Sequence, residues 1–289
     1  MKLDENIMQF LTQLLKPQRL TEIVDIGANP IDGDPPYKVL LDNKLCRLTG
    51  FEPQAEALQQ LNNLKSDLEN YLPYAVGDGQ KHILNICRYS GMTSLFKPNM
   101  NTLDHFIALK PNAEIIQEVE VETLKLDDID EIEQLDFLKI DIQGAELSVF
   151  QSGRNKLQHA VAIQTEISFI TLYENQPSMG DVDVELRAQG FVPHCFAALK
   201  KWPIAPFMFE QNPRQPLNQL LEADLVYVRD FTRSDLMESE QLKHLAIIAH
   251  YCYQSFDLAL RCMMVLQPRG VLSEADIQLY IQHLNQPSQ

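Results

Sequence analysis

The feature that most constrains the fold of this chain is an alternation of short apolar runs with segments of helical periodicity. Within the first 230 residues, apolar runs rich in β-branched residues are mostly separated by segments in which apolar residues recur every three or four positions. The strand-like runs cover 22–26, 46–51, 72–76, 136–141, 160–166, 190–195 and 224–229, and the helical segments cover 53–69, 144–158 and 180–189. Such alternation is typical of an α/β protein with a doubly wound, mostly parallel sheet, here of seven strands.

Two segments depart from this alternation. Residues 4–16 place their apolar side chains on one helical face and are followed by Pro17, so we expect an N-terminal helix there. Residues 80–122 hold two further strand-like pieces, 82–88 and 117–124, around a turn-rich middle. This segment is predicted to be an insertion at the edge of the sheet.

The last part of the chain is helical throughout. Helical periodicity covers 239–251, 253–266 and 273–285, and Ser273 is followed by acids as at a helix N-cap. We therefore divide the chain into a principal α/β domain, residues 1–230, and a helical extension, residues 231–289. We expect the extension to act as a cap or as a homodimer interface rather than as a separate catalytic unit.

The charge balance excludes several classes of partner. The chain has 40 acidic and 24 basic residues and a formal charge of −16, and such a surface repels nucleic acid and anionic lipid. No apolar run approaches the ~20 residues that span a bilayer, and the N-terminus lacks the apolar segment of a signal peptide. The five cysteines are scattered and form no CxxC pair. We therefore expect a reduced, cytoplasmic protein that binds neither nucleic acid nor membrane.

The first predicted strand ends in a tight turn at Gly27, and ligands of open parallel sheets bind at such strand ends. A GxGxxG dinucleotide fingerprint would require two more glycines, where this chain has Asn29 and Asp32. Asp25, Asp32 and Asp34 would also repel a pyrophosphate, since two unit charges ~4 Å apart interact by about 4 kcal/mol at an effective dielectric constant of 20. The same acids suit S-adenosylmethionine, which carries a sulfonium and an ammonium group and no phosphate.

The next two predicted strands also end at acidic residues. The second ends in the sequence GFEP, so that Glu52 is placed to accept hydrogen bonds from two ribose hydroxyls. The third ends in AVGDG, where Asp78 could accept a hydrogen bond from an adenine amino group. Each acid alone is compatible with an ordinary turn. It is the ordered series after three successive strands that indicates a cofactor site.

Six segments, in their order along residues 20–230, resemble the FkbM family of S-adenosylmethionine-dependent methyltransferases. They are VDIGAN, FEP, AVGD, TLKLDDI, FLKIDIQGAELSVFQSG and IQTEISFITLYENQP. The most specific part is residues 139–146, where the chain has Gln143 and the family usually has Glu. The resemblance implies a Rossmann-like class I methyltransferase fold with a terminal antiparallel strand. It also implies O-methylation of a hydroxyl group on a sugar, glycoconjugate or natural product, with a small molecule or a glycan as acceptor.

The resemblance further implies a set of cofactor-binding residues. The turn at Gly27 would lie under the methionine part of the cofactor, Glu52 would hold the ribose, and Asp141 would face the methionine part or the substrate. The alternative for Asp141 is an N-cap of the following helix. The full cofactor-binding set is Asp25, Gly27, Ala28, Asn29, Glu52, Pro53, Gly77, Asp78 and Asp141.

Glu166 is the candidate catalytic base. It ends the fifth predicted strand, next to the strand that ends at Asp141, so the two acids should face each other across the cleft. A base can contribute ~10²–10⁴ to the rate of such a transfer. The alternative is a buried acid paired with a lysine or a backbone donor. Two neighbouring carboxylates also suit a metal ion, but Gln143 is a poor third ligand, so no metal site is predicted and activity is expected to survive a chelator.

Three residues are candidates for contact with the acceptor. Thr93 and Ser94 lie in the turn-rich insertion, and Trp202 lies between the last two predicted strands, where packing in the core is the alternative. Two other functions stay open at this point. A nicotinamide-dependent oxidoreductase could use the same sheet, and a binding module could keep the fold without catalysis.

Overall fold

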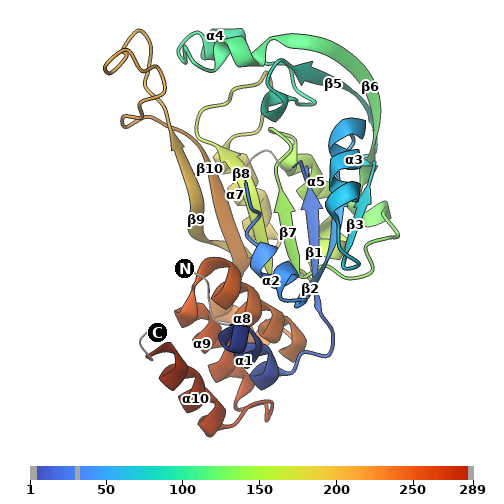
Figure 1. The fold of residues 1–289 in the computed structure, drawn as a ribbon, viewed down its shortest axis with the longest axis vertical. Coiled ribbons are helices and arrows are strands. Elements are labelled where there is room, and N and C mark those ends of the chain that lie inside the picture. Colours follow the sequence, from blue (N-terminus) through green and yellow to red (C-terminus); the bar gives the residue numbers. More distant parts are fainter. Residues whose placement is uncertain (1–4, 30–32, 286–289) are drawn as a thin grey trace.

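A seven-stranded sheet in the order β3-β2-β1-β7-β8-β10-β9 forms the centre of the structure (Figure 1). The computed structural model describes residues 5–29 and 33–285. The strands are β1 Thr21–Ile26, β2 Cys46–Phe51, β3 Glu69–Leu72, β7 Phe137–Ile140, β8 Ala162–Ser168, β9 Phe191–Lys201 and β10 Leu220–Arg229. The first five in spatial order are parallel, and β10 runs antiparallel to both of its neighbours. The predicted doubly wound sheet and its antiparallel strand are therefore confirmed.

The third predicted strand differs from the structure. Residues 72–76 do not form one strand, because Pro73 has no N–H and interrupts the ladder between β3 and β4, Ala75–Gly77. β4 leaves the central sheet and pairs with β6, Ile115–Lys125, in a second sheet that β5, Lys81–Cys87, completes.

This second sheet is the predicted insertion at the edge. Its strands β5 and β6 pair antiparallel, and β6 curves over the side of the central sheet in Figure 1. The turn-rich middle of the insertion folds into three short helices, which are η1 Ser90–Met92, α4 Met100–Leu103 and η2 Lys110–Ala113. The insertion thus places residues 90–91 and 93–95 above the carboxyl ends of the central strands, where they line a cleft.

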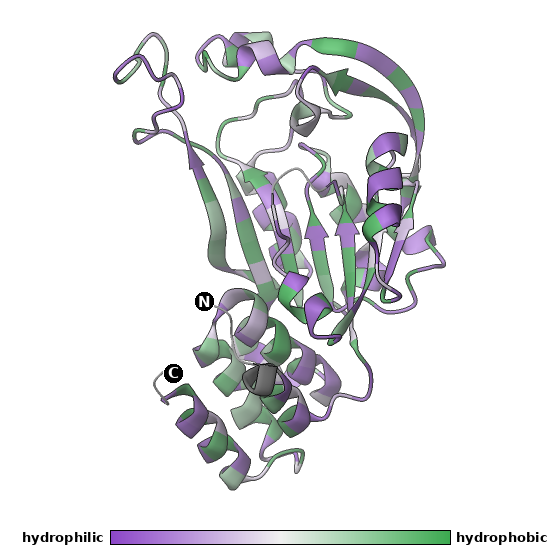
Figure 2. Ribbon diagram, in the orientation of Figure 1, coloured by the Kyte–Doolittle hydropathy of each residue, from purple (hydrophilic) through white to green (hydrophobic). Residues whose placement is uncertain are grey.

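Helices cover both faces of the central sheet. The helices between its strands are α2 Lys38–Asp42, α3 Ala55–Leu64, α5 Glu146–Ser152, α6 Arg154–Leu157 and α7 Met179–Ala188. The short turn η3 Leu126–Asp128 precedes β7, and η4 Phe231–Leu236 follows β10. The predicted helix 144–158 is divided at Gly153 into α5 and α6. On one face, Val149 and Phe150 of α5 and Val182 of α7 pack against strand residues such as Ile163. Figure 2 shows the hydrophobic residues gathered along these strands.

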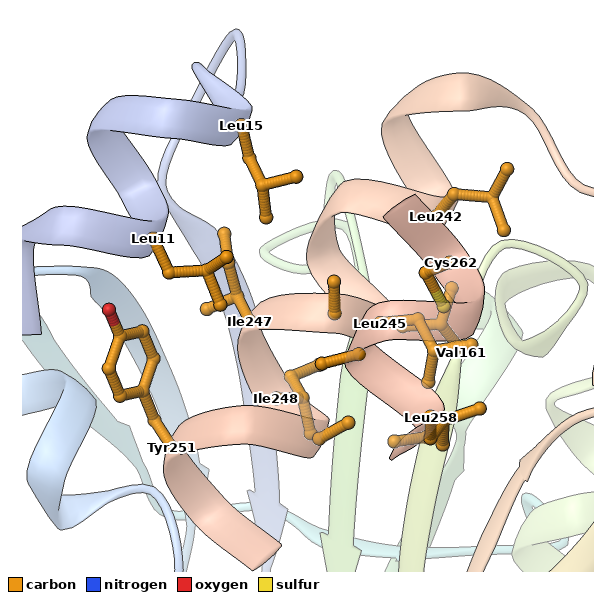
Figure 3. Packing of buried hydrophobic residues seen from close by; sticks show 14 of the residues in the cluster. Leu11, Leu15, Val161, Leu242, Leu245, Ile247, Ile248, Tyr251, Leu258 and Cys262 are labelled. Carbon is orange, nitrogen blue, oxygen red and sulfur yellow. The ribbon is translucent and has the colours of Figure 1, made fainter. Parts of the chain in front are cut away.

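On the other face, the amino-terminal ends of the parallel strands are covered by the first helix and the last three (Figure 1). These are α1 Glu5–Leu15, α8 Ser239–Tyr253, α9 Phe256–Leu266 and α10 Glu274–Leu284, and Ser273 caps α10 as predicted. Leu11, Leu245 and Leu258 share one buried cluster with Val226 of β10 and with Val161, which directly precedes β8, as Figure 3 shows for four of the five. The helical extension therefore completes the core of the α/β domain. No helix in the described part of the chain is long and apolar enough to cross a membrane.

Leu245→Ala tests this shared core. Leu245 of α8 is fully buried, so its truncation is expected to lower the free energy of unfolding by about 2–5 kcal/mol. Because the cluster includes strand residues, urea unfolding followed by far-UV circular dichroism and by tyrosine fluorescence should show one transition at the same, lowered midpoint. Leu279→Ala on α10, where the side chain is 47% exposed, is the control and should change stability by no more than about 0.5 kcal/mol. Two separate transitions would show that the extension is an independent unit.

Candidate cofactor and acceptor cleft

A cleft of about 1380 Å³ opens at the carboxyl ends of the central strands. This volume exceeds the roughly 300–1,000 Å³ that is usual for one small ligand, so the cleft has room for a cofactor and a second molecule. Ten of the predicted site residues line it. They are Asp25, Gly27, Ala28, Asn29, Glu52, Pro53, Thr93, Ser94, Asp141 and Glu166.

The turn after β1 is held against two neighbouring strands. The backbone N–H groups of Gly27 and Ala28 both donate to the Phe51 carbonyl, at 3.0 and 3.1 Å, and Asp141 N–H donates to the Ile26 carbonyl at 3.0 Å. Gly27 has a φ of +80°, and a Cβ there would lie 2.0 Å from the carbonyl oxygen of Asp141. Only glycine allows this approach, which fixes the floor of the cleft.

Asp25 lines the cleft, but its charge is already balanced within the protein. Its Oδ2 accepts a hydrogen bond from the Tyr37 hydroxyl, and its Oδ1 lies 3.1 Å from Lys139 Nζ. Lys139 is the residue directly opposite Asp25 in the pairing of β1 with β7. Burial lowers the pKa of Lys139, but Asp25 and Asp141 outweigh burial and hold that pKa above its ordinary value. Asp25 therefore fixes the floor of the cleft and does not supply a free negative charge. Asp32, the second acid of this loop, lies outside the described residues.

Glu52 stands at the tip of β2, as predicted. It is 2% exposed, and its Oε1 accepts a hydrogen bond of 2.8 Å from the backbone N–H of Gln54. Burial raises the pKa of the Glu52 carboxyl, and the nearby charge of Asp25 adds to the effect. A buried carboxylate that lines a cleft is suited to accept hydrogen bonds from a ligand.

Three predicted residues are not brought to the cleft. Asp78 accepts hydrogen bonds from His82 Nε2 and Gln80 N–H, at 2.8 and 2.9 Å, and so closes a turn of the second sheet. Neither Asp78 nor Gly77 lines the cleft, because the chain leaves the central sheet after Pro73. In their place, Tyr71, Tyr74, Ala75 and Val76 line this end of the cleft. Trp202 packs against a separate apolar cluster of the insertion and does not line the cleft either.

The two predicted catalytic acids lie side by side at the carboxyl ends of β7 and β8, with Asp141 next to the Gly27 turn and Glu166 farther from β2. The Nε2 amide of Gln143 donates to Asp141 Oδ1 at 2.9 Å and to Glu166 Oε2 at 2.8 Å. Lys200 Nζ lies 2.6 Å from Glu166 Oε1. Glu166, whose side chain is 4% exposed, has a pKa well above its ordinary value because of burial first, and because of the charges of Asp141 and Glu222. The site therefore contains a carboxyl group that is poised to take up a proton.

The turn that follows Asp141 is held in place by Glu146. Its Oε1 accepts hydrogen bonds from the backbone N–H groups of Ile142 and Gly144, at 2.9 and 3.2 Å, in the first turn of α5. Burial raises the pKa of Glu146 to about 7. Glu146 thus fixes the loop that carries Asp141 and Gln143, although its sequence position alone gave no reason to choose it.

The alternative given for Glu166, a buried acid paired with a lysine, matches its contact with Lys200, although the sequence did not indicate which lysine, and the linking role of Gln143 was not predicted. Lys200 is one of two consecutive lysines in β9, and only the register with β10, where it pairs with Glu222, shows which of them points into the cleft. Ser94 was predicted as an acceptor contact. Its Oγ donates to the Gln143 carbonyl at 2.6 Å, so it ties the insertion to the floor of the cleft.

Comparison with known families identifies the family of the chain that forms this cleft. The family described as "Methyltransferase FkbM domain" matches residues 25–193, which is more than half of the chain and spans the strands that carry Glu52, Asp141 and Glu166. The chain belongs to the FkbM methyltransferase family. For this FkbM domain S-adenosylmethionine is the expected cofactor, and the close approach at Gly27 together with the buried acid Glu52 fits it.

Solved structures resemble this chain only distantly. Magnesium protoporphyrin IX methyltransferase from Synechocystis PCC 6803, with bound SAM, is 9% identical over 78% of this chain and 79% of its own, with a TM-score of 0.36. Precorrin-6y C5,15-methyltransferase from Geobacter metallireducens GS-15 is 11% identical over 79% and 91% of the two chains, with a TM-score of 0.36. No curated protein matches the sequence. The family assignment therefore rests on the domain match.

The cleft also bears on the metal prediction. Among residues 5–29 and 33–285, no three His, Cys, Asp or Glu side chains are grouped so as to hold a metal ion. Gln143 occupies the position between Asp141 and Glu166 where a third acid would complete such a group. The prediction that activity survives a chelator is unchanged.

Proposed function

We propose that this protein transfers a methyl group from S-adenosylmethionine to a hydroxyl group of a small-molecule or glycan acceptor. The observation that carries the proposal is the pair Asp141 and Glu166 at one end of a methyltransferase cleft, with the pKa of Glu166 raised by burial. O-methylation needs a group that removes the hydroxyl proton. Glu166 is the group best placed for that task.

The cofactor would lie along the tips of the first strands. Glu52 would accept hydrogen bonds from the ribose hydroxyls, and the backbone of Gly27, Ala28 and Asn29 would lie beside the methionine part. Tyr71 and Tyr74, rather than the predicted Asp78, would border the adenine. When bound, S-adenosylmethionine supplies an electrophilic methyl group on its sulfonium.

The acceptor would occupy the end of the cleft near Lys200. Glu166 would take the proton of the acceptor hydroxyl, so that the oxygen becomes nucleophilic as it approaches the methyl group. Lys200 holds the carboxylate of Glu166 in place at 2.6 Å. The side chains around this end of the cleft are polar and include Thr93, Gln164 and Asp224, which supports a hydroxylated acceptor.

Glu52→Ala tests the placement of the cofactor. Because the variant loses hydrogen bonds to a charged acceptor, we expect S-adenosylhomocysteine to bind with about 1.5–3 kcal/mol less free energy, or roughly 10- to 150-fold more weakly. Titration calorimetry measures the change. Glu56→Ala is the control, because Glu56 is exposed one turn along the chain in α3 and does not line the cleft. Unchanged affinity in Glu52→Ala would remove Glu52 from the site.

A further inference from the structure

The side-chain amide of Gln143 donates hydrogen bonds to both acids of the cleft, Asp141 and Glu166. Within residues 5–29 and 33–285, no other group does so. Each of its two N–H hydrogens has a carboxylate acceptor, Asp141 Oδ1 at 2.9 Å and Glu166 Oε2 at 2.8 Å. The two acids come from neighbouring parallel strands, β7 and β8, whose ends meet at this edge of the sheet. A neutral group with two donors therefore sits where two like charges converge.

The orientation of this amide is fixed from its other side. The side-chain Oε1 of Gln143 accepts a hydrogen bond of 2.9 Å from the Tyr173 hydroxyl. The backbone carbonyl of Gln143 accepts a second one of 2.6 Å from Ser94 Oγ. The residue also has a φ of +56°, in the tight turn that Gly144 continues. Rotating the amide by half a turn would place Oε1 against both carboxylates, so the hydrogen-bond network selects the present orientation.

No neighbouring charged group takes the place of the Gln143 amide between the two carboxylates. The titratable groups that face Glu166 are Lys200, Glu222, Asp141 and Tyr173, and those that face Asp141 include Lys139, Glu146 and Lys200. Of the cations among them, only Lys200 is in contact with Glu166, and it is bound to the other carboxylate oxygen, Oε1. Two carboxylates in one buried site disfavour each other's ionised form unless donors lie between them.

We propose that Gln143 is a positioning residue that holds the side chains of Asp141 and Glu166 together through its amide, so that the carboxylate of Glu166 can form beside Asp141. With Lys200 on Oε1 and Gln143 on Oε2, the carboxylate of Glu166 is held from both sides. The role of Glu166 as a base rests on the proposed function, but the positioning of the two acids does not.

Thermal unfolding of two variants, without cofactor or acceptor, tests the proposal. Gln143→Met keeps the volume and removes both donors, and Gln143→Glu keeps the shape and adds a third acid. The pKa of Glu166 is raised in the folded state, so the stability it contributes is present at low pH and is lost as the pH rises through that pKa. Removing the donors raises this pKa further. Both variants should therefore lose more stability at pH 8 than at pH 5.

The expected losses in melting temperature are about 3–8 °C at pH 8 for either variant, and less than half of that at pH 5. The loss of Gln143→Glu should be the smaller one at pH 5, because a protonated Glu can still donate one hydrogen bond. Gln267→Glu, at an exposed position after α9, is the charge control and should shift the melting temperature by less than about 1 °C at either pH.

A loss that is equal at the two pH values would show that Gln143 only fills space, and would overturn the proposal. If one variant fails to fold, the other decides by the same comparison. Because the experiment uses neither S-adenosylmethionine nor an acceptor, its result stands whether or not the proposed methyl transfer is correct. Calorimetry with S-adenosylhomocysteine tests that function separately.

Discussion

Glu166→Gln is expected to reduce turnover of methyl transfer by about 100-fold or more while S-adenosylhomocysteine binds nearly as well as to the wild type. The substitution keeps the shape of the side chain and removes the base, whose contribution is typically ~10²–10⁴. Glu166 lies beside Lys200 and Gln143 at the acceptor end of the cleft, away from the tip of β2 that we assign to the cofactor. A loss in turnover without a loss in cofactor affinity is therefore the signature of a base.

Two further variants distinguish a role of Glu166 as the base from a role in cofactor binding or in packing. Asp141→Asn should weaken S-adenosylhomocysteine binding as well as turnover, because Asp141 follows β7 next to the Gly27 turn. Glu185→Gln is the control, since Glu185 is also buried but pairs with Arg154 and does not line the cleft. Its turnover should stay within about fivefold of the wild type. Near wild-type turnover in Glu166→Gln would show that another group takes the proton or that positioning alone carries the rate.

Gly27→Ala is expected to destabilise the protein by about 3 kcal/mol or more and to weaken S-adenosylhomocysteine binding at least tenfold. The added Cβ would lie 2.0 Å from the Asp141 carbonyl oxygen, which belongs to the backbone and cannot rotate away. The turn after β1 or the end of β7 must then move, and both border the cleft. Urea unfolding and titration calorimetry measure the two effects.

Gly33→Ala is the matched control for this variant. Gly33 lines the same cleft and has a φ of +91°, but a Cβ there would meet no atom within 4 Å. In Gly33→Ala the free energy of unfolding should fall by only about 1–2 kcal/mol, which is the cost of placing a non-glycine residue in the left-handed conformation. Equal losses in the two variants would show that backbone strain, and not the close approach to Asp141, is what requires Gly27.

The sheet could be predicted from the sequence because its signals are local. Each central strand is an apolar run bounded by turns, and six of the seven predicted runs overlap the strands of the central sheet over most of their length. The third run failed because the AVG segment after Pro73 has the same apolar character as a central strand but pairs with Thr123 of β6. Whether this segment joins the central sheet or the second sheet depends on a pairing partner about 50 residues away, which no local pattern shows.

The same limit applies to the site. Gly27, Glu52 and Asp141 follow strands, so their place at the sheet edge could be predicted. The contacts of Gln143 and Lys200 with Glu166 span 23 and 34 residues and depend on how β8, β9 and β10 pair. Periodicity likewise identified the C-terminal helices but gave no sign that α8 packs on the sheet, because an apolar helix face does not name its partner.

Titration calorimetry of the full chain with S-adenosylhomocysteine tests the central claim most directly. The account predicts a single site per chain, with a dissociation constant in the micromolar range or tighter, that is weakened in Glu52→Ala and kept in Glu56→Ala. It also predicts no binding of NAD, because the turn after β1 lacks two of the three fingerprint glycines and has Asn29 and Asp32 in their place. A folded wild-type chain that binds NAD, or that binds no S-adenosylhomocysteine, would contradict it.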